Sequence, residues 1–205
     1  MGDDRAVPLR HLKPQDARRV PWKNGRGVTE ELALWPPGAS FERGDFDWRI
    51  ARAGVAEDGS FSEFPGFERV LVVCSGEGLL LRHGLAAPVR VPRLQSHRFS
   101  GDDATTAELL AGAAIDVNVL ARRGRVAAEV SVLRAGRLSL PASDAEHSFV
   151  HVIEGDVAAR VAGGSEPVTL SPRESLWILG EAPPIELQPA GSEHVLLLVR
   201  LRTPN

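Results

Sequence analysis

Glycines recur along this chain at a fixed spacing of 79 residues. Shifting the sequence by that offset without gaps superposes four pairs of them: Gly76 on Gly155, Gly84 on Gly163, Gly101 on Gly180 and Gly112 on Gly191. Glycine forms about a tenth of the chain, so chance predicts on the order of half a coincidence over this stretch. Two copies of one structural unit therefore follow each other.

Short apolar runs bounded by Gly, Pro, Asp and Ser recur throughout the sequence, whereas helical periodicity is scarce. Examples are FDWRIARA, RVLVVC, GLLLRHG, IDVNVL, HSFVHVI and HVLLLVRL. This pattern predicts an all-β protein. Within each repeat, the even rhythm of short antiparallel strands is typical of a jelly roll or a small closed barrel, which buries its sheet edges. We predict a bicupin, two small antiparallel jelly-roll β-barrels in tandem, with one long β-sandwich as the alternative.

The predicted boundary between the barrels lies near Arg125. Residues 1–125 would form the first cupin-like barrel, and residues 126–205 the second, which we interpret as structural. The single cysteine, Cys74, lies in the apolar run VLVVC and cannot form an internal disulfide, which fits a reducing compartment. The acidic start MGDDRAVPLR has no apolar signal region, and no apolar run approaches the ~18 residues of a membrane span. These features predict a cytoplasmic protein.

The overall charge is close to balanced. Lys and Arg number 24 against 27 Asp and Glu, a net charge of -3. This balance favours neither a nucleic-acid nor a membrane partner. A small anionic metabolite is the predicted partner, and a homodimer stays open.

The histidines do not follow the pattern of a metal-binding cupin, in which two His, a Glu and a later His converge. His147 and His151 share one face of a predicted strand, but Ser148 occupies the place of the Glu. The first copy has only His83 and His97, in two different turns. There is also no nucleophile elbow, no P-loop and no paired C-x-x-C. We predict no metal, no cofactor and no catalytic residue; a degenerate metal site is the alternative.

Polar side chains occupy one face of two predicted strands in the first repeat. In FDWRIARA, alternation places Arg49 among small alanines and opposite an aromatic face. In AIDVNVL it places Asp116 and Asn118 together. The positions that match these two at the 79-residue offset are Val195 and Leu197, both apolar. A polar pocket is therefore predicted in the first barrel; pairing of Arg49 with Asp47 or Asp116 is the structural alternative.

Further candidates lie in PWKNGRGVTEEL (21–32) and GSFSEFPGFERVLVV (59–73). The first segment is predicted to form a rim of the pocket. In the second, Arg69 begins an apolar strand, and Ser62 either caps the backbone or donates to a ligand. Arginine binds a carboxylate bidentately, and amides and hydroxyls complete its hydrogen bonds. The predicted site for a small carboxylate comprises Lys23, Asn24, Thr29, Arg49, Phe61, Ser62, Arg69, Asp116 and Asn118.

Several segments resemble the HutD/Ves family. They are PWKNGRGVTEELALWPPG, FDWRIARAGVAEDGSFSEFPGFERVL and FSGD followed by AELLAGAAIDVNVLARRGR. The family patterns are W-K-N-G-G-G-T-T-R-E, F-x-W-R-[IV]-S-x-A, G-x-F-S-x-F-P-G-x-x-R, F-x-G-D and D-x-N-x-M-x-R-R. The resemblance implies a bicupin fold. For HutD it implies a modulating role in bacterial histidine utilisation, through sensing of a small acidic metabolite; Ves members are linked to cold or general stress.

The family motifs are matched residue by residue over about Pro21 to Arg123. Matching residues are Trp22, Lys23, Asn24, Gly25, Gly27, Thr29, Trp48, Arg49, Phe61, Ser62, Pro65, Gly66, Arg69, Asp116, Asn118, Arg122 and Arg123. The chain departs from the pattern at Arg26 (usually Gly), at Glu30 (usually Arg) and at Ile50-Ala51-Arg52, where a Ser is common. Arg26 is expected to reshape its loop, and Glu30 to weaken an anion site.

The predicted function is that of a small-molecule-binding regulatory protein. Its ligand would be a small carboxylate of the formylglutamate, formate or urocanate class. The alternatives are a cupin-type enzyme acting on a small acid, a stress-related Ves-like protein, and an interaction module whose polar face is a solvated surface.

Overall fold

The computed structural model describes residues 9–21, 28–163 and 166–204. Its regular structure consists of strands, apart from one three-residue turn of 3-10 helix, η1 (Pro14–Asp16), so the all-β prediction is confirmed. Across these ranges, no helix has the length and apolar character needed to cross a membrane. The contacts divide the chain into two compact units. One spans residues 17–127, and the other combines residues 128–203 with the N-terminal segment that ends at Asp16.

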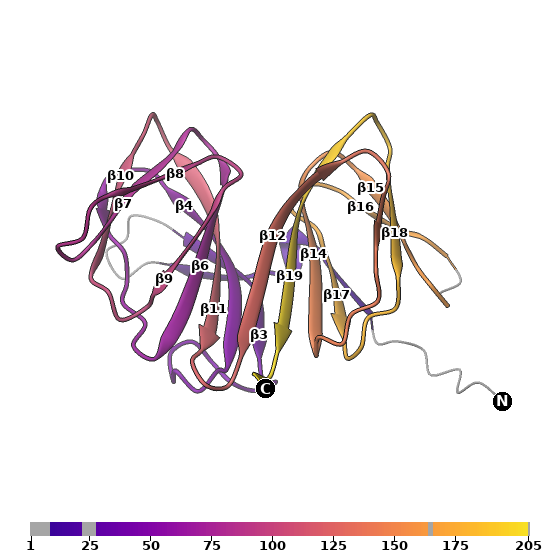
Figure 1. Ribbon diagram of the computed structural model, residues 1–205, viewed down its shortest axis with the longest axis horizontal. Coiled ribbons are helices and arrows are strands. Elements are labelled where there is room, and N and C mark those ends of the chain that lie inside the picture. The colour runs from indigo at the N-terminus through magenta and orange to yellow at the C-terminus, as the bar shows by residue number, and fades with distance from the viewer. Residues whose placement is uncertain (1–8, 22–27, 164–165, 205) are drawn as a thin grey trace. The chain divides into compact units, whose positions relative to one another are not determined.

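The first unit consists of two antiparallel sheets that enclose an apolar core (Figure 1). The six-stranded sheet has the order β2-β3-β4-β11-β6-β9, and the four-stranded sheet has the order β5-β10-β7-β8. The strands are β2 (Arg18–Pro21), β3 (Val28–Trp35), β4 (Trp48–Val55), β5 (Gly59–Ser60), β6 (Phe67–Ser75), β7 (Gly78–His83), β8 (Val89–Pro92), β9 (Ser96–Ser100), β10 (Thr105–Leu109) and β11 (Ala114–Arg122).

The second unit repeats this plan with a five-stranded sheet, β1-β17-β14-β19-β12, and a four-stranded sheet, β13-β18-β15-β16. Its core includes Val150, Leu170, Leu187 and Leu196, all at most 1% exposed. The strands are β1 (Leu9–Leu12), β12 (Ala127–Ala135), β13 (Leu138–Leu140), β14 (His147–Glu154), β15 (Val157–Val161), β16 (Val168–Leu170), β17 (Ser175–Leu179), β18 (Ile185–Pro189) and β19 (His194–Arg202).

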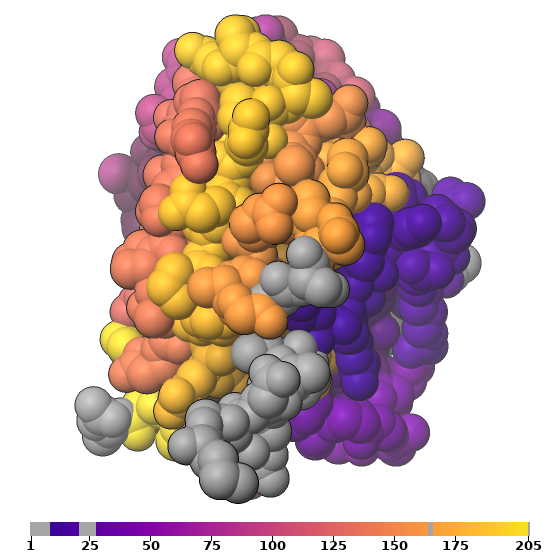
Figure 2. All heavy atoms as spheres, turned by 90° about the vertical axis from the view of Figure 1, so that its right-hand side faces the viewer, coloured from indigo at the N-terminus to yellow at the C-terminus, as the bar shows by residue number. Residues whose placement is uncertain are grey.

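The N-terminal strand does not belong with the first barrel, in which the sequence-based boundary had placed it. Strand β1 pairs antiparallel with β17, with Leu9 opposite Ile178 and Leu12 opposite Ser175. In Figure 2 indigo N-terminal residues lie beside orange residues of the second unit. The pairing covers one edge of the five-stranded sheet, and an uncovered edge would expose unpaired backbone groups. Hydropathy patterns do not reveal such long-range pairings.

Backbone conformation preserves the repeat in detail. Leu94 (φ 63) and Arg173 (φ 76) are the two non-glycine residues with positive φ in the described part of the chain. They are 79 residues apart, at the same place in each unit. Positive φ is uncommon for side chains with a Cβ, so its recurrence at one offset shows that the two units share their turn geometry.

The strand register decides which side chains of the first unit face its interior. Leu71 of β6, a core residue, lies opposite Asn118 of β11, which in turn lies opposite Ala51 of β4. Opposed residues in an antiparallel pair project to the same side of the sheet. The same face therefore carries Arg49 and Arg69, which both lie opposite Leu120. The predicted polar face of the first barrel points into its interior.

The offset between corresponding residues of the two units increases from 79 to 80 at the last strand of each unit, β11 in the first and β19 in the second. In the first unit Leu71 pairs with Asn118 and Arg69 with Leu120. In the second unit their counterparts Val150 and Ser148 pair with Leu198 and Arg200. The irregularity in each ladder falls at the corresponding place, between Val73 and Ser75 in β6 and between Val152 and Glu154 in β14, so the extra residue enters the chain before β19. Val195 and Leu197 are therefore the wrong matches for Asp116 and Asn118, and Leu120 has an arginine as its counterpart.

Candidate functional site

Arg69 is one of two buried cations of the first barrel, with 6% of the residue exposed. It projects from β6 into the interior, where its Nε donates to Oδ1 of Asn118 at 2.8 Å. Its Nη1 donates to the backbone carbonyl of Ser62 at 3.3 Å. No other hydrogen bond of this guanidinium occurs among the described residues, so Nη2 retains its donors for a further molecule.

Three aromatic rings surround the same guanidinium. Its central carbon lies 4.8 Å from the ring centroid of Phe61, 5.5 Å from that of Phe64 and 5.1 Å from that of Phe99. Ring faces attract a cation and exclude water, which strengthens charge interactions. Burial lowers the pKa of Arg69 to about 10, and Asp116 partly opposes this change. Arg69 therefore stays charged at neutral pH.

Asp116 of β11 lies on the same interior face as this arginine, and 1% of the residue is exposed. Asn118 links the two, because its Nδ2 donates to Oδ1 of Asp116 while its own Oδ1 accepts from Arg69. Burial raises the pKa of Asp116 to about 7, against the opposing effect of Arg69 and Arg52. The carboxyl group thus changes charge near neutral pH, and the net charge around Arg69 changes with it.

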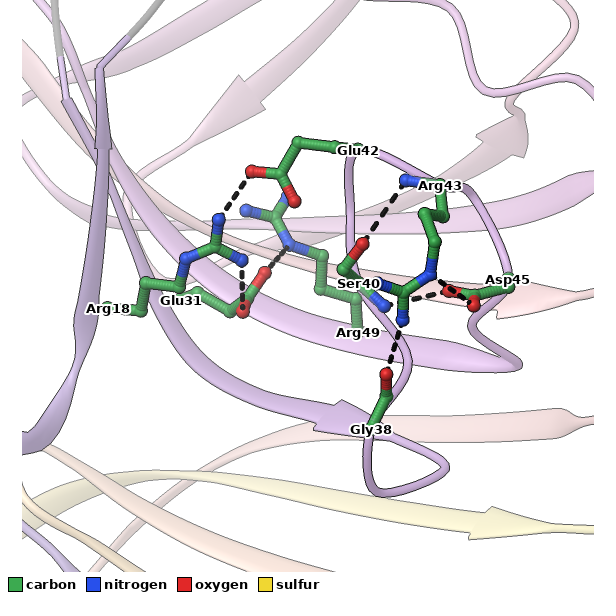
Figure 3. Close-up of polar contacts among 8 residues, drawn as sticks. All are labelled: Arg18, Glu31, Gly38, Ser40, Glu42, Arg43, Asp45 and Arg49. Atoms are coloured by element: carbon green, nitrogen blue, oxygen red, sulfur yellow. Dashed lines mark hydrogen bonds and ion pairs between the residues drawn. The ribbon is translucent and has the colours of Figure 1, made fainter.

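Arg49 is the second buried cation on this face, and Figure 3 shows its partners. Its Nε donates to Oε2 of Glu31 at 2.8 Å, and its guanidinium carbon lies 4.3 Å from the ring centroid of Phe41. Arg18 approaches the same carboxylate at 3.8 Å and also pairs with Glu42. Burial lowers the pKa of Arg49, and the bond to Glu31 acts in the opposite direction.

The two alternatives raised from the sequence for pairing of Arg49 are both wrong. Its partner is Glu31, whereas Asp47 immediately precedes β4 and contacts Arg125 at 3.1 Å. Thr29 and Glu31 alternate along β3, opposite Ala53 and Ala51. This register puts Glu31 on the interior face beside Arg49. The Nη atoms of Arg49 make no hydrogen bond within the described ranges.

Arg49 and Arg69 flank Leu120 from opposite sides, one strand away in each direction. Neighbouring strands lie ~4.8 Å apart, so their backbones are about 10 Å apart. Both side chains extend from the same face and carry donors without a partner among the described residues. This arrangement provides two fixed positive groups inside one barrel, with Leu120 and Asn118 of β11 on the strand between them.

The departure from the family pattern at Glu30 has a local explanation. Glu30 lies opposite Arg52 in the β3–β4 ladder, and Nη1 of Arg52 donates to Oε2 of Glu30 at 2.9 Å. Both belong to the face that is opposite to Glu31 and Arg49. Two of the unusual residues therefore compensate each other in one ion pair, and the expected weakening of an anion site by Glu30 is not supported by its position.

The side chains of the two histidines of the first barrel contact each other, although the sequence pattern placed these residues in separate turns. Nε2 of His83 lies 2.9 Å from Nε2 of His97, and Nδ1 of His83 lies 2.9 Å from the hydroxyl of Thr105. That hydroxyl donates to the carbonyl of Asp103 at 3.0 Å. It therefore accepts from Nδ1–H of His83, whose Nε2 accepts from His97. Burial lowers the pKa of both rings, so both are neutral at neutral pH.

The ring of Phe99 connects the histidine pair to Arg69. The centroid of His83 lies 4.6 Å from that of Phe99, over which Arg69 also lies. Among the residues that the structure describes, no three His, Cys, Asp or Glu side chains are grouped as a metal site would require. The chemistry of this end of the barrel is that of cations, aromatic faces and neutral imidazoles.

The structure brings together most of the predicted site. Arg49, Arg69, Asp116 and Asn118 share the interior face, and Phe61 packs against Arg69. Thr29 also lies on that face, opposite Ala53. Ser62 takes part through its carbonyl rather than its hydroxyl. Lys23 and Asn24, like Arg26, lie outside the described residues.

Sequence reasoning missed several members of this site. They are Arg18, Glu31, Phe41 and Phe99. The alternation in VTEELALW places Glu31 on the face of Thr29 and provided one usable signal. The others come from loops or from distant strands, whose approach depends on the closed fold.

Comparison with known proteins gives consistent matches. The HutD family model matches residues 14–197. Protein Ves of Citrobacter koseri is 37% identical over 121 residues, which are 57% of this chain and 61% of that protein. An uncharacterized 21.2 kDa protein in the hutC 3' region of Pseudomonas putida is 37% identical over 113 residues, 55% of this chain and 57% of that protein. The chain thus spans about three fifths of the length of these two relatives.

Solved structures agree with the fold. The structure of HutD from Pseudomonas fluorescens SBW25, described as a formate condition, superposes with a TM-score of 0.80 and 27% identity. The match covers 97% of this chain and 100% of that one. Cupin proteins of much lower identity share the same fold. The predicted bicupin architecture is therefore confirmed.

Proposed function

This chain belongs to the HutD family of bicupin proteins, and we propose that it is a regulatory protein that binds a small carboxylate metabolite inside its first barrel. One observation carries the proposal. Arg49 and Arg69 project from β4 and β6 into the same interior, and both retain guanidinium donors without a partner among the described residues. Buried arginines of this kind are suited to bidentate recognition of carboxylates.

The surroundings of the two arginines favour a ligand over a purely structural role. Each guanidinium is already oriented, Arg49 by Glu31 and Arg69 by Asn118. Ligand binding would therefore cost little of the conformational entropy that flexible side chains lose when they become ordered. Phe61, Phe64 and Phe99 also provide flat apolar walls, which suit a short planar acid. The ligand class we propose is that of formate, formylglutamate and urocanate.

The proposed biological role follows from family membership. A related protein is described as lying in the hutC 3' region, and a structural neighbour is HutD itself. We place this chain in the control of histidine utilisation, where it would report the level of an acidic intermediate. Binding without turnover distinguishes this role from that of a cupin enzyme.

A thermal-shift screen tests the proposal, with formate, formylglutamate, urocanate and glutamate as probes. A ligand at about 100 times its dissociation constant stabilises the folded state by ~2.7 kcal/mol. For a chain of this length the melting temperature should rise by roughly 5 to 10 °C. Arg49→Gln should remove the shift, whereas Arg82→Gln, a change at an exposed ion pair, should keep it. The absence of a shift with every probe would contradict the proposal.

A further inference from the structure

A small cavity lies at one end of the second barrel, which the sequence had assigned a structural role. Its volume is about 90 Å³. It is lined by Glu129 of β12, by residues 142–145 of the loop before β14, and by Arg200 and Arg202 of β19. All of these belong to the second unit. The cavity is too small for most metabolites, since pockets for larger ligands measure about 300–1,000 Å³.

The two arginines of this cavity differ in their partners. Nη2 of Arg202 donates to Oε1 of Glu129 at 2.6 Å, so this charge is compensated. Arg200 makes no hydrogen bond or ion pair with any described residue. Its Nε is moreover shielded from solvent and has no acceptor. Keeping a charged donor group inside a protein without an acceptor is unfavourable, so an acceptor is expected beside Arg200.

The residue opposite Arg200 in the β14–β19 ladder also carries a buried polar group that has no partner among the described residues. Ser148 of β14 lies directly opposite Arg200, and 2% of this residue is exposed. Its hydroxyl is also buried and has no hydrogen-bond partner in the part of the chain that the structure describes. Directly opposed side chains in an antiparallel pair lie ~5 Å apart on one face. Two unsatisfied donors, a guanidinium and a hydroxyl, thus occupy adjacent places in the same interior.

Ser148 and Arg200 occupy the positions in the second barrel that Arg69 and Leu120 occupy in the first. Ser148 corresponds to Arg69 and Arg200 to Leu120 in the two ladders. In this row of its interior the first barrel carries Arg49 and Arg69 on either side of Leu120, whereas the second barrel carries Arg200 at the position of Leu120 itself. The likeness was hidden in the ungapped repeat, because the offset increases by one residue before Arg200.

We propose that the second barrel holds a binding site for a small carboxylate, with Arg200 as its principal ligand residue. Arg200 would bind the carboxylate through the Nη donors of its guanidinium, because its Nε is shielded from solvent. The hydroxyl of Ser143, which accepts from the backbone N–H of Ala145 at 3.2 Å, retains its proton for the second oxygen. This site is independent of the one proposed in the first barrel.

The charges at the cavity define the class of ligand. Glu129 is neutralised by Arg202, but the exposed Asp144 lines the cavity without a partner among the described residues. Its negative charge opposes a dianion such as sulfate and tolerates a single carboxylate near Arg200. The small volume restricts that carboxylate to a few non-hydrogen atoms. Acetate is therefore a suitable probe.

The test is an NMR titration of the full-length protein with acetate, followed at the Nε–Hε resonance of Arg200. The Arg69→Gln background removes the site proposed for the first barrel. We expect saturable shifts of the Arg200 signal and of the backbone amides of residues 142–145. Arg200→Gln should abolish the shifts of these amides, and Arg160→Gln, which removes an exposed arginine of the same unit, should leave them unchanged. Asp144→Asn should tighten acetate binding about two- to fivefold.

The inference would be overturned by a linear, non-saturating response to acetate, by unchanged shifts of residues 142–145 in the Arg200→Gln variant, or by binding of sulfate as tight as that of acetate. Should Arg200→Gln not fold, Ser143→Ala provides a second measurement, and it should weaken acetate several-fold. Loss of acetate binding in Arg69→Gln alone would mean that the only carboxylate site is in the first barrel.

Discussion

The Glu31 carboxylate lies 2.8 Å from Nε of Arg49, and the two side chains are 10% and 6% exposed. Such a pair stabilises a fold only weakly as a whole, because removing both charges from water offsets much of their attraction. Breaking it from one side is different, since the remaining charge stays buried. The pair therefore fixes the position of Arg49 more than it contributes net stability.

Glu31→Gln should lower the free energy of unfolding by about 3 kcal/mol, because it leaves the buried Arg49 without its counter-charge. Urea denaturation followed by circular dichroism measures this change. The matched control is Glu108→Gln, whose pair with Arg82 is 46% exposed on both sides and should contribute less than about 1 kcal/mol. Equal losses in the two variants would show that Glu31 has no special role.

The affinity for a carboxylate should depend on pH through Asp116. Burial raises the pKa of its carboxyl group to about 7. Above that pH the group is negative and competes with a bound anion for Arg69, and below it the group is neutral. Affinity should therefore increase as the pH falls from 8 to 6. The dissociation constant measured at both values by calorimetry should differ several-fold.

The matching variant is Asp116→Asn, which keeps the shape and removes the titration. It should bind tightly at both pH values, so that the pH step disappears. His83 and His97 also gain charge on acidification. Because burial lowers their pKa values, they contribute to the pH dependence of binding only at pH values below ~6.5. A pH step that survives in Asp116→Asn would assign it to these histidines.

The stability of the protein at acid pH should depend on His194. This residue is 1% exposed, and both ring nitrogens are buried without a hydrogen-bond partner among the residues that the structure describes. Burial lowers its pKa below that of the unfolded chain. Its contribution is fully present above about pH 6.5 and is lost as the pH falls toward the lowered value. The melting temperature of His194→Leu should consequently decrease less between pH 7.5 and 5.0 than that of the unaltered protein.

Two glycines of the repeat should respond differently to alanine. Gly76 has φ +87, and a Cβ built there lies 2.6 Å from the carbonyl oxygen of Ala113. Gly84 has φ +52 and nothing within 4 Å. Gly76→Ala should cost about 3 kcal/mol or more through strain and collision, and Gly84→Ala about 1 kcal/mol through strain alone. Urea unfolding of both variants provides the comparison, and similar costs would contradict it.

Much of the fold was predictable because glycine spacing and strand alternation are local signals. The alternation around Arg49 and Asn118 also predicted their common face, which the ladders confirm. Three features needed the structure. Strand β1 pairs across the whole sequence, Glu31 replaces the expected acids beside Arg49, and the offset between the two units increases by one residue before Arg200. Each depends on long-range register, which a single sequence does not encode in its periodicity.

The central claim is that Arg69 and Arg49 bind a small carboxylate in the first barrel, and calorimetric titration with formylglutamate tests it most directly. The account predicts one saturable site in this barrel, lost in Arg69→Gln and in Arg49→Gln. Both variants are first checked for native circular dichroism, and Arg82→Gln serves as the charge-matched control. Affinity within twofold of the unaltered protein in either correctly folded variant, or no heat of binding with any small carboxylate, would contradict the account.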